Sequence, residues 1–413
     1  MALTLSISLP GSADPDTEAL RSAGIDAYRD GRFAEAETRL RAAIARRPGD
    51  AAAHDNLGLV LAALGRPAEA ESAFRQAIEL APSLAGANNN LAALYRAQQR
   101  LDDALAASAR ALALDPSVAA FHLNHGEILR ALLRPREAAE AYARALRLKP
   151  DYADAYFALG NLWYETGNRD GARFALDACL KLDPADRHGA RALLALVEPA
   201  SGDVLQFPAA YVRNLFDGYA PRFEKHLVEQ LDYRAPQRLR AAIDACDPGR
   251  VFDDAIDLGC GTGLAGAAVR PIVRRLVGVD LSPAMIEHAR ARGVFDALGV
   301  DGLDSALAGR ERAFDLILAA DVFIYVGALD EVLPAIFRAL RPDGLAGFTI
   351  ESDPAGPPCR LRSSRRFAHN PGDLAALAAR AGFALARRED FVLRREAGAP
   401  IDGTLFVLRR PAG

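Results

Sequence analysis

The sequence has few of the features that mark a membrane, metal-binding or nucleic-acid-binding protein. No apolar run in its 413 residues approaches the ~20 that a membrane span needs, and Met1–Pro10 lacks the basic and apolar regions of a secretory signal. The four cysteines lie far apart, without the spacing of disulfides or metal ligands. A net charge of −4 gives no basic excess for nucleic acid. We therefore expect a cytoplasmic protein that holds no metal and binds neither membrane nor nucleic acid.

A 34-residue period runs through the first half of the chain, which the total length allows to be a domain of its own. Prolines recur at positions 48, 82, 116, 150 and 184, and alanines at 36, 70, 104, 138 and 172. Small residues keep the same period, and they let two antiparallel helices approach closely before each proline ends the pair. They are Gly24, Gly58, Ala92, Gly126 and Gly160. Large apolar residues such as Phe74 and Tyr142 recur on the second helix.

This period resembles the tetratricopeptide repeat. The resemblance implies an all-α solenoid over residues 17–197, made of five repeats and a solvating cap helix, after a flexible N-terminus of residues 1–16. A Pro/Gly-containing stretch then breaks the helical pattern, and we take residues 198–208 as a linker.

Three asparagines, Asn56, Asn90 and Asn124, occupy the same position in successive repeats. By resemblance to superhelical peptide-binding arrays, this position lies on the first helix and faces the concave groove. Side-chain amides both donate and accept, so a row of them can pair with the backbone of an extended peptide. We expect a protein or peptide partner there. The alternative is a groove that binds nothing, because asparagine is also ordinary at this position.

The second half is organised around the stretch Ala255–Gly263, an apolar strand that runs into a glycine-rich turn, and a second apolar strand that ends at Asp280. Glycines at 259, 261 and 263 allow a sharp turn and let a ligand lie directly on the backbone. In a doubly wound sheet the two strand ends are neighbours. The acid at the second end can then accept hydrogen bonds from both ribose hydroxyls of a nucleoside.

Two ligand classes use this arrangement. Residues Gly261–Gly266 formally fit the dinucleotide-binding fingerprint, but Asp257 would face a pyrophosphate unfavourably and suits a cationic ligand. The stretch Asp257–Gly263 resembles motif I of class I S-adenosylmethionine-dependent methyltransferases, whose ligand carries a sulfonium and an ammonium and no phosphate. A glycine turn that only packs helix on strand is the third interpretation.

The methyltransferase resemblance implies a Rossmann-like α/β domain over residues 209–413, with a mostly parallel seven-stranded sheet and a terminal antiparallel hairpin. It implies S-adenosyl-L-methionine as cofactor. An aromatic segment at residues 211–227 is similar to one that closes over the cofactor in many small-molecule methyltransferases. The residues implied to bind the cofactor are Tyr211, Tyr219, Asp257, Gly259, Cys260, Gly261, Gly263, Asp280, Leu281, Met285, Asp301, Gly302 and Asp321. The adenine contact stays open between Asp301 and Asp304.

Candidate catalytic residues follow the predicted fourth strand, Phe314–Ala320. Ligands bind at the carboxyl ends of such strands, which places Asp321 and Tyr325 near the transferring methyl. An insertion at residues 352–370 carries Arg365 and Arg366, which could hold an anionic group of the substrate, and His369, a candidate base. The alternative for this insertion is an ordinary solvated surface.

Together these patterns predict an S-adenosylmethionine-dependent methyltransferase whose repeats recruit a protein substrate or partner. Two alternatives stay open. One is a small-molecule methyltransferase whose repeats serve oligomerisation or docking. The other is a non-catalytic adaptor with a vestigial methyltransferase domain, which the intact Asp257, glycine turn and Asp280 disfavour.

Overall fold

The structure is a computed structural model, and it describes residues 15–198, 206–220, 223–224, 233–396 and 398–412. Its contacts divide the chain into two compact units, Met1–Pro184 and Ala185–Gly413. The expected N-terminal segment and the linker lie mostly outside the described residues.

This division differs from the domain boundary predicted after residue 197. Helix α11 (Ala190–Val197), which was expected to cap the repeats, belongs to the second unit. Its Ala192 is buried against Phe207, Tyr211 and Phe367. The periodic pattern could not indicate this, because an amphipathic helix fits either neighbour equally well.

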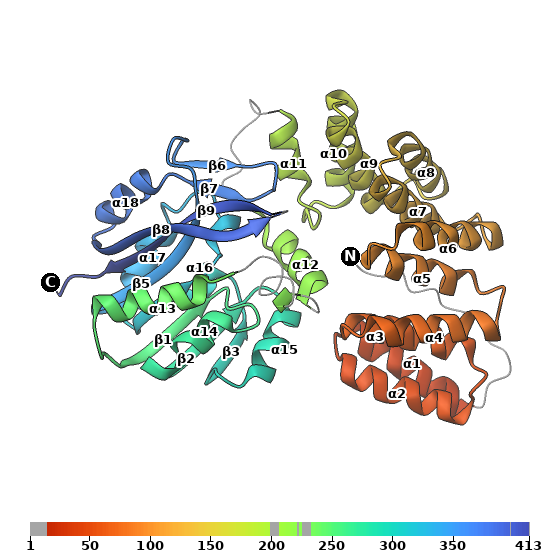
Figure 1. The fold of residues 1–413 in the computed structure, drawn as a ribbon, viewed down its shortest axis with the longest axis horizontal. Helices are drawn as coiled ribbons and strands as arrows, with labels where there is room; N and C mark the ends of the chain where they lie inside the picture. The colour runs from red at the N-terminus through yellow and green to blue at the C-terminus, as the bar shows by residue number, and fades with distance from the viewer. Residues whose placement is uncertain (1–14, 199–205, 221–222, 225–232, 397, 413) are drawn as a thin grey trace. The chain divides into compact units, whose positions relative to one another are not determined.

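The described part of the first unit is a stack of antiparallel helix pairs, as predicted (Figure 1). Its helices are α1 (Pro15–Arg29), α2 (Phe33–Arg46), α3 (Ala51–Ala63), α4 (Pro67–Leu80), α5 (Ala85–Ala97), α6 (Leu101–Leu114), α7 (Ala119–Ala131), α8 (Pro135–Leu148), α9 (Ala153–Glu165) and α10 (Arg169–Leu182). The small periodic residues have the packing role expected of them. A Cβ added at Gly58 would lie 2.5 Å from the Phe74 ring, and one at Gly126 would lie 2.5 Å from the Tyr142 ring.

The predicted asparagine row lies on the first helices, but the row pairs with itself. Asn90 Nδ2 donates to Asp55 Oδ1 at 2.9 Å, and Asn124 Nδ2 donates to Asn89 Oδ1 at 2.9 Å. All of these side chains and Asn56 are buried. The amide donors of Asn90 and Asn124 therefore join neighbouring repeats, which favours a packing role for these two side chains, and peptide binding by the row stays a prediction. One residue of offset between successive repeats brings each amide within reach of the preceding helix.

The second unit is an α/β fold whose described residues contain one nine-stranded sheet. The strands are β1 (Phe252–Leu258), β2 (Val273–Asp280), β3 (Ala297–Val300), β4 (Phe314–Ala319), β5 (Leu340–Ser352), β6 (Cys359–Leu361), β7 (Phe367–His369), β8 (Ala384–Glu396) and β9 (Ala399–Arg409). Strands β3, β2, β1, β4 and β5 pair in parallel in that order. Strand β9 pairs antiparallel with both β5 and β8, which confirms the predicted hairpin. The insertion supplies the two additional strands, with β7 parallel to the end of β5 and β6 antiparallel to β7.

Helices cover both faces of this sheet (Figure 1). Alternate residues of the strands point to opposite sides, so Ile256 and Ile317 pack beneath α17 (Val332–Ala339) and α18 (Pro371–Arg380). Residues on the other side, such as Leu316 and Leu318, pack against α13 and α14. The other helices of the unit are α12 (Ala209–Tyr219), α13 (Ala235–Cys246), α14 (Leu264–Val269), η3 (Arg270–Ile272), α15 (Pro283–Arg292), α16 (Leu303–Leu307) and η4 (Phe323–Tyr325). Among the described residues, no helix is both long and apolar enough to cross a membrane.

Candidate functional site

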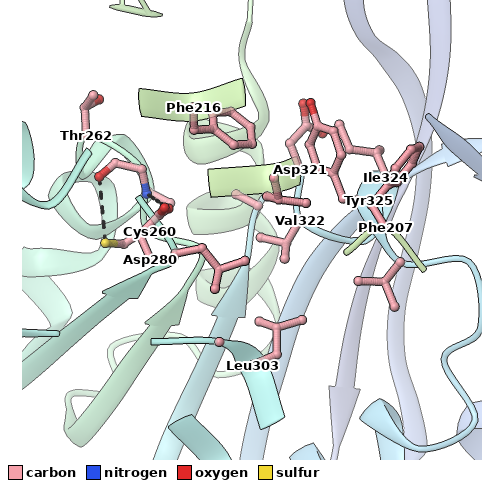
Figure 2. Close-up of a pocket in the computed structure, with 18 of the residues that line it drawn as sticks. Phe207, Phe216, Cys260, Thr262, Asp280, Leu303, Asp321, Val322, Ile324 and Tyr325 are labelled. Carbon is pink, nitrogen blue, oxygen red and sulfur yellow. Dashed lines mark hydrogen bonds between the residues drawn. The ribbon is translucent and has the colours of Figure 1, made fainter. Parts of the chain in front are cut away.

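A pocket lies at the carboxyl ends of β1, β2, β3 and β4, the edge where such sheets bind ligands. Figure 2 shows Cys260 and Asp280 at one end of it and Asp321 and Tyr325 at the other. Residues from α12 complete the wall. The lining includes Gln206, Phe207, Phe216, Tyr219, Phe223, Tyr233, Gly259, Cys260, Gly261, Thr262, Asp280, Leu281, Asp301, Gly302, Leu303, Asp304, Asp321, Val322, Tyr325, Arg366 and Arg394.

The turn after β1 forms one side of the pocket. Gly259 and Gly261 have φ of 64° and 53°, a left-handed conformation that favours glycine. Among the described residues, a Cβ added at Gly261 would meet only the Phe223 ring, at 3.6 Å, which leaves the space over this residue open. Asp280 lies opposite. Its Oδ2 accepts from the Gly261 amide at 2.9 Å and its Oδ1 from the Ser282 amide at 2.9 Å, which fixes the carboxylate at the pocket wall.

Two buried polar side chains near this turn make no hydrogen bond of good geometry among the described residues: Asp257, through both carboxyl oxygens, and Thr262. The Gly266 amide is close enough to Asp257 to oppose the rise of its pKa, and Thr262 lies beside Glu224. Asp257 is 1% exposed, and burial raises its pKa to about 7, with the nearby charge of Asp280 adding to the rise. Burial also raises the pKa of Asp280. Two carboxyls held this way favour a ligand that brings positive charge.

These residues fit S-adenosylmethionine. Asp280 and the open Gly261 backbone would hold the ribose and the amino-acid part of the cofactor. The buried Asp257 carboxyl would favour the positive charge that the cofactor carries. Leu281 and Leu303 line the pocket on the side of Asp301 and Asp304, where an adenine ring would be flanked by apolar groups. Both acids lie in the wall, so the choice between them for the adenine contact stays open.

Helix α12 covers the pocket and is tied down on both sides. Asp217 Oδ1 accepts from Ser282 Oγ at 2.5 Å, and the Phe216 and Tyr325 ring centroids are 5.4 Å apart. Phe216 and Phe223 line the pocket, and Phe223 also packs against the core on one face of the sheet. Part of the predicted aromatic segment, Pro221 and Arg222 with residues 225–227, lies outside the described residues.

The far end of the pocket is built on Asp321, directly after β4. Its φ of 58° is unusual for a residue with a side chain. The Asp321 amide donates to Thr349 Oγ1 at 2.9 Å, and that hydroxyl donates to Asp321 Oδ1 at 3.3 Å. Burial raises the pKa of Asp321, and the charge of Arg394 opposes the rise.

Arg394, on β8, is the buried cation of this end, at 2% exposure. Its Nη2 donates to Glu351 at 2.6 Å and its Nε to Glu396 at 2.7 Å. Its Nη1 lies 3.5 Å from Asp321 Oδ2 and has no hydrogen-bond partner among the described residues. Arg366 pairs with Glu396 and lies beside the Tyr325 hydroxyl, whose pKa burial raises.

The pocket brings together most of the residues predicted for the site. Those that line it are Tyr219, Gly259, Cys260, Gly261, Asp280, Leu281, Asp301, Gly302, Asp321, Tyr325 and Arg366. Besides His369, five others do not line it, and one of these is Asp257, which is buried at the end of β1. Tyr211 stacks on Phe207 with centroids 4.9 Å apart, Met285 is fully buried, and Gly263 begins α14. Arg365 lies beside the Tyr211 hydroxyl, outside the pocket wall.

The prediction that His369 is a base is wrong. The side chain is 2% exposed, and its Nε2 lies 2.9 Å from the Val326 carbonyl and 3.2 Å from that of Gly327, so Nε2 donates. Burial lowers its pKa. Strand β7 turns the ring into the sheet edge, and sequence offered no sign of that strand.

Sequence analysis missed Phe207, Tyr233 and Arg394. Tyr233 is buried, and Asp321 and Asp257 are both close enough to raise its pKa along with burial. Only an arginine within an otherwise alternating strand, Phe391–Arg395, could have drawn attention to position 394.

Comparison with family models agrees with this division of the chain. A methyltransferase-domain model matches residues 256–346, from β1 into β5. Tetratricopeptide-repeat models match residues 21–85, 63–119 and 153–186, and a TPR-repeat model matches residues 136–167.

Curated relatives are similar to the second unit. The chain is 39% identical over 109 residues to a trans-aconitate 2-methyltransferase of Methylobacterium radiotolerans, covering 26% of this chain and 41% of the relative. It is 32% identical over 149 residues to human methyltransferase-like protein 27, covering 34% and 58%. The chain thus spans about half the length of these relatives. The solved structure of pilF from Pseudomonas aeruginosa is 21% identical at a TM-score of 0.41, covering 52% of this chain and 98% of that one. The chain therefore carries tetratricopeptide repeats followed by a Rossmann-like methyltransferase domain.

Proposed function

We propose that the protein is an S-adenosylmethionine-dependent methyltransferase. The observation that carries the proposal is the pairing of Asp280 with the turn after β1. Both carboxyl oxygens of Asp280 are fixed by backbone amides, and the Gly261 backbone beside them is open to the pocket. Asp257 supports the same ligand, because a buried carboxyl of raised pKa favours a cationic neighbour.

The cofactor would supply a methyl group on a sulfur that is already a good leaving group. The contribution of the chain is then mainly positioning and the exclusion of water. Helix α12 covers the pocket and is held in place by the contacts of Asp217 and Phe216. Asp280 and Gly261 would fix the ligand beneath this helix.

The acceptor would be a small molecule. The far end of the pocket is enclosed by aromatic side chains, with Phe207 in edge contact with Tyr325 at 6.1 Å, so little of a folded protein could enter. A relative named for trans-aconitate methylation is consistent with a small acceptor. We further propose that the repeats bind a protein partner, since concave solenoid faces are usual binding surfaces. Their alternative use, self-association, would show as a molecular mass above that of the monomer in light scattering.

Calorimetric titration with S-adenosylhomocysteine tests the cofactor assignment. We expect micromolar binding by the wild-type protein and at least tenfold weaker binding by Asp280→Ala, which removes the carboxylate facing the ligand. The matched control is Asp253→Ala, a change on strand β1. Among the described residues, the exposed Asp253 carboxylate forms an ion pair with Arg274 only. Wild-type protein that is folded and does not bind would overturn the proposal and favour the adaptor interpretation.

A further inference from the structure

Resting on the proposed function, we propose that the methyl acceptor is the hydroxyl group of a planar, apolar molecule, a phenol or enol, held between Asp321 and Arg394. Neither the relatives' names nor the family model assigns a role to these two residues.

A donor and an acceptor stand side by side at the far end of the pocket. Arg394 Nη1 is buried, has no hydrogen-bond partner among the described residues and lies 3.5 Å from Asp321 Oδ2. The other nitrogens of Arg394 are committed to Glu351 and Glu396. Both residues line the pocket. A buried donor without a partner is costly, and a ligand atom that accepts from it offsets that cost.

A hydroxyl group is the nucleophile that suits both neighbours at once. Its proton donates to Asp321 Oδ2, while the same oxygen accepts from Arg394 Nη1. A carboxylate acceptor would meet the charge of Asp321, and a protonated amine would meet the charge of Arg394. A neutral amine can donate to Asp321, but its one lone pair cannot both accept from Arg394 and attack carbon.

The charges around this point are balanced, which also disfavours an anionic acceptor. With Asp321 ionised, three arginines face three carboxylates in connected ion pairs, so the cluster carries no excess positive charge. The members are Arg362, Arg366, Arg394, Glu351, Glu396 and Asp321.

The walls favour a flat apolar body behind the hydroxyl. Phe216 and Tyr325 are in edge contact beside Asp321, and Phe207 lies against Tyr325 (Figure 2). Rings packed edge to face around an open space accept another ring readily.

The backbone at Asp321 is held in the orientation that this role needs. A non-glycine residue in the left-handed region is strained, and such strain persists where surrounding contacts impose it. Here both hydrogen bonds with Thr349 fix the residue, so that Oδ2 meets Arg394.

In the reaction, the acceptor oxygen gives its proton to Asp321 Oδ2 and forms a bond to the methyl carbon. The carbon–sulfur bond of the donor breaks, and its electron pair turns the sulfonium into a neutral thioether. Arg394 Nη1 stabilises the negative charge that develops on the oxygen.

The first test is binding without turnover. With S-adenosylhomocysteine saturating, para-cresol is titrated beside its methyl ether, para-toluidine and para-toluate. We expect para-cresol to bind about tenfold or more tightly than the other three, since only it serves both neighbours. Asp321→Asn and the double variant Arg394→Met/Glu351→Gln should abolish the difference, and Arg395→Met, an exposed change on the same strand, should keep it. Equal binding of the four compounds, tighter binding of the toluate or toluidine, or no binding of any would overturn the proposal. Failure to bind S-adenosylhomocysteine itself would instead overturn the proposed function.

The second test is the pH dependence of methyl transfer to para-cresol, followed with labelled donor. The groups that face Asp321 are Thr349 and Glu351 on β5, Arg394 on β8, Arg366, Tyr325 and Tyr233. The rate should rise with pH as Asp321 ionises. Removing the cation in the double variant should move that rise to higher pH, a shift that a merely structural role would not produce. Transfer at the wild-type rate by Asp321→Asn would contradict the proposal.

Discussion

Glycines of the repeats and Gly261 of the second unit serve opposite purposes. In the repeats, Gly58 and Gly126 lie in ordinary helices, and the missing side chain makes room for a ring 2.5 Å from where a Cβ would stand. In the turn after β1, Gly259 and Gly261 have positive φ, and the space over Gly261 is open to the pocket. A periodic glycine filled by a neighbour indicates packing. A left-handed glycine that also lines a pocket, as Gly261 does, lets a ligand reach the backbone.

Buried aspartates repeat the contrast. Asp55 and Asp257 are each 1% exposed, and burial raises the pKa to about 6 for Asp55 and about 7 for Asp257. Asp55 accepts from Asn90 of the next repeat, whereas neither oxygen of Asp257 makes a hydrogen bond of good geometry among the described residues. The repeats supply a side-chain partner for their own buried acid, and the second unit supplies none to Asp257 among its described residues.

The largest expected effect comes from filling a packing glycine. Gly58→Val would place its side chain within the Phe74 ring, so helices α3 and α4 must separate. We expect a loss of about 3 kcal/mol in unfolding free energy, as overpacking in a close-packed core produces. Urea denaturation followed by far-ultraviolet circular dichroism measures it, while affinity for S-adenosylhomocysteine should not change.

Two variants check that sterics are the cause. Gly49→Val should leave stability nearly unchanged, because an added Cβ there has no atom within 4 Å. The double variant Gly58→Val/Phe74→Ala should recover part of the loss by removing the ring. A Gly58→Val protein as stable as the wild type would break the distinction between packing and binding glycines.

The next effect is a gain in stability, from Asp55→Asn. The folded-state pKa of Asp55 is raised from 3.8 to about 6, so the folded protein binds a proton more tightly than the unfolded chain. This carboxyl therefore lowers stability as pH rises from about 4 to about 6, by about 3 kcal/mol at pH 7. Asparagine keeps an oxygen that accepts from Asn90 and carries no charge. We expect a gain of about 2 kcal/mol at pH 7 and little gain at pH 4, from denaturation at both values.

A gain of equal size at both pH values would show that Asp55 is neutral in the folded protein at pH 7, and the parallel with Asp257 would fail. Asp257→Asn sharpens the same comparison. We expect it to weaken S-adenosylhomocysteine binding, whereas Asp55→Asn should leave binding unchanged.

The fold could be predicted because its signals are periodic or local. The 34-residue repeat predicted the paired helices, and Asp257–Gly263 with Asp280 predicted the strand ends at which one side of the pocket lies. What sequence could not supply were contacts between distant segments. Arg394 reaches Asp321 across 73 positions of the chain (394 − 321), and Phe207 reaches Tyr325 across 118 (325 − 207). The roles predicted for His369 and Tyr211 differ from their positions in the structure. Strand β7 and helix α11 bury these side chains, and no periodic pattern in the sequence indicates that burial.

The smallest expected effect is the one that best separates the two kinds of glycine. Gly261→Ala adds a Cβ whose described neighbours are ring atoms of Phe223 at 3.6 and 3.7 Å, so it causes no internal clash. Its left-handed φ of 53° costs alanine about 1 kcal/mol of stability. The added methyl would nevertheless occupy the surface on which the proposed ligand lies. We expect S-adenosylhomocysteine affinity to fall about tenfold, about 1.4 kcal/mol, in calorimetric titration, with a smaller loss of stability than Gly58→Val produces. If Gly261→Ala instead lowered stability and spared affinity, then the turn after β1 would serve packing, as the glycines of the repeats do, and the open space above it would not be the cofactor site.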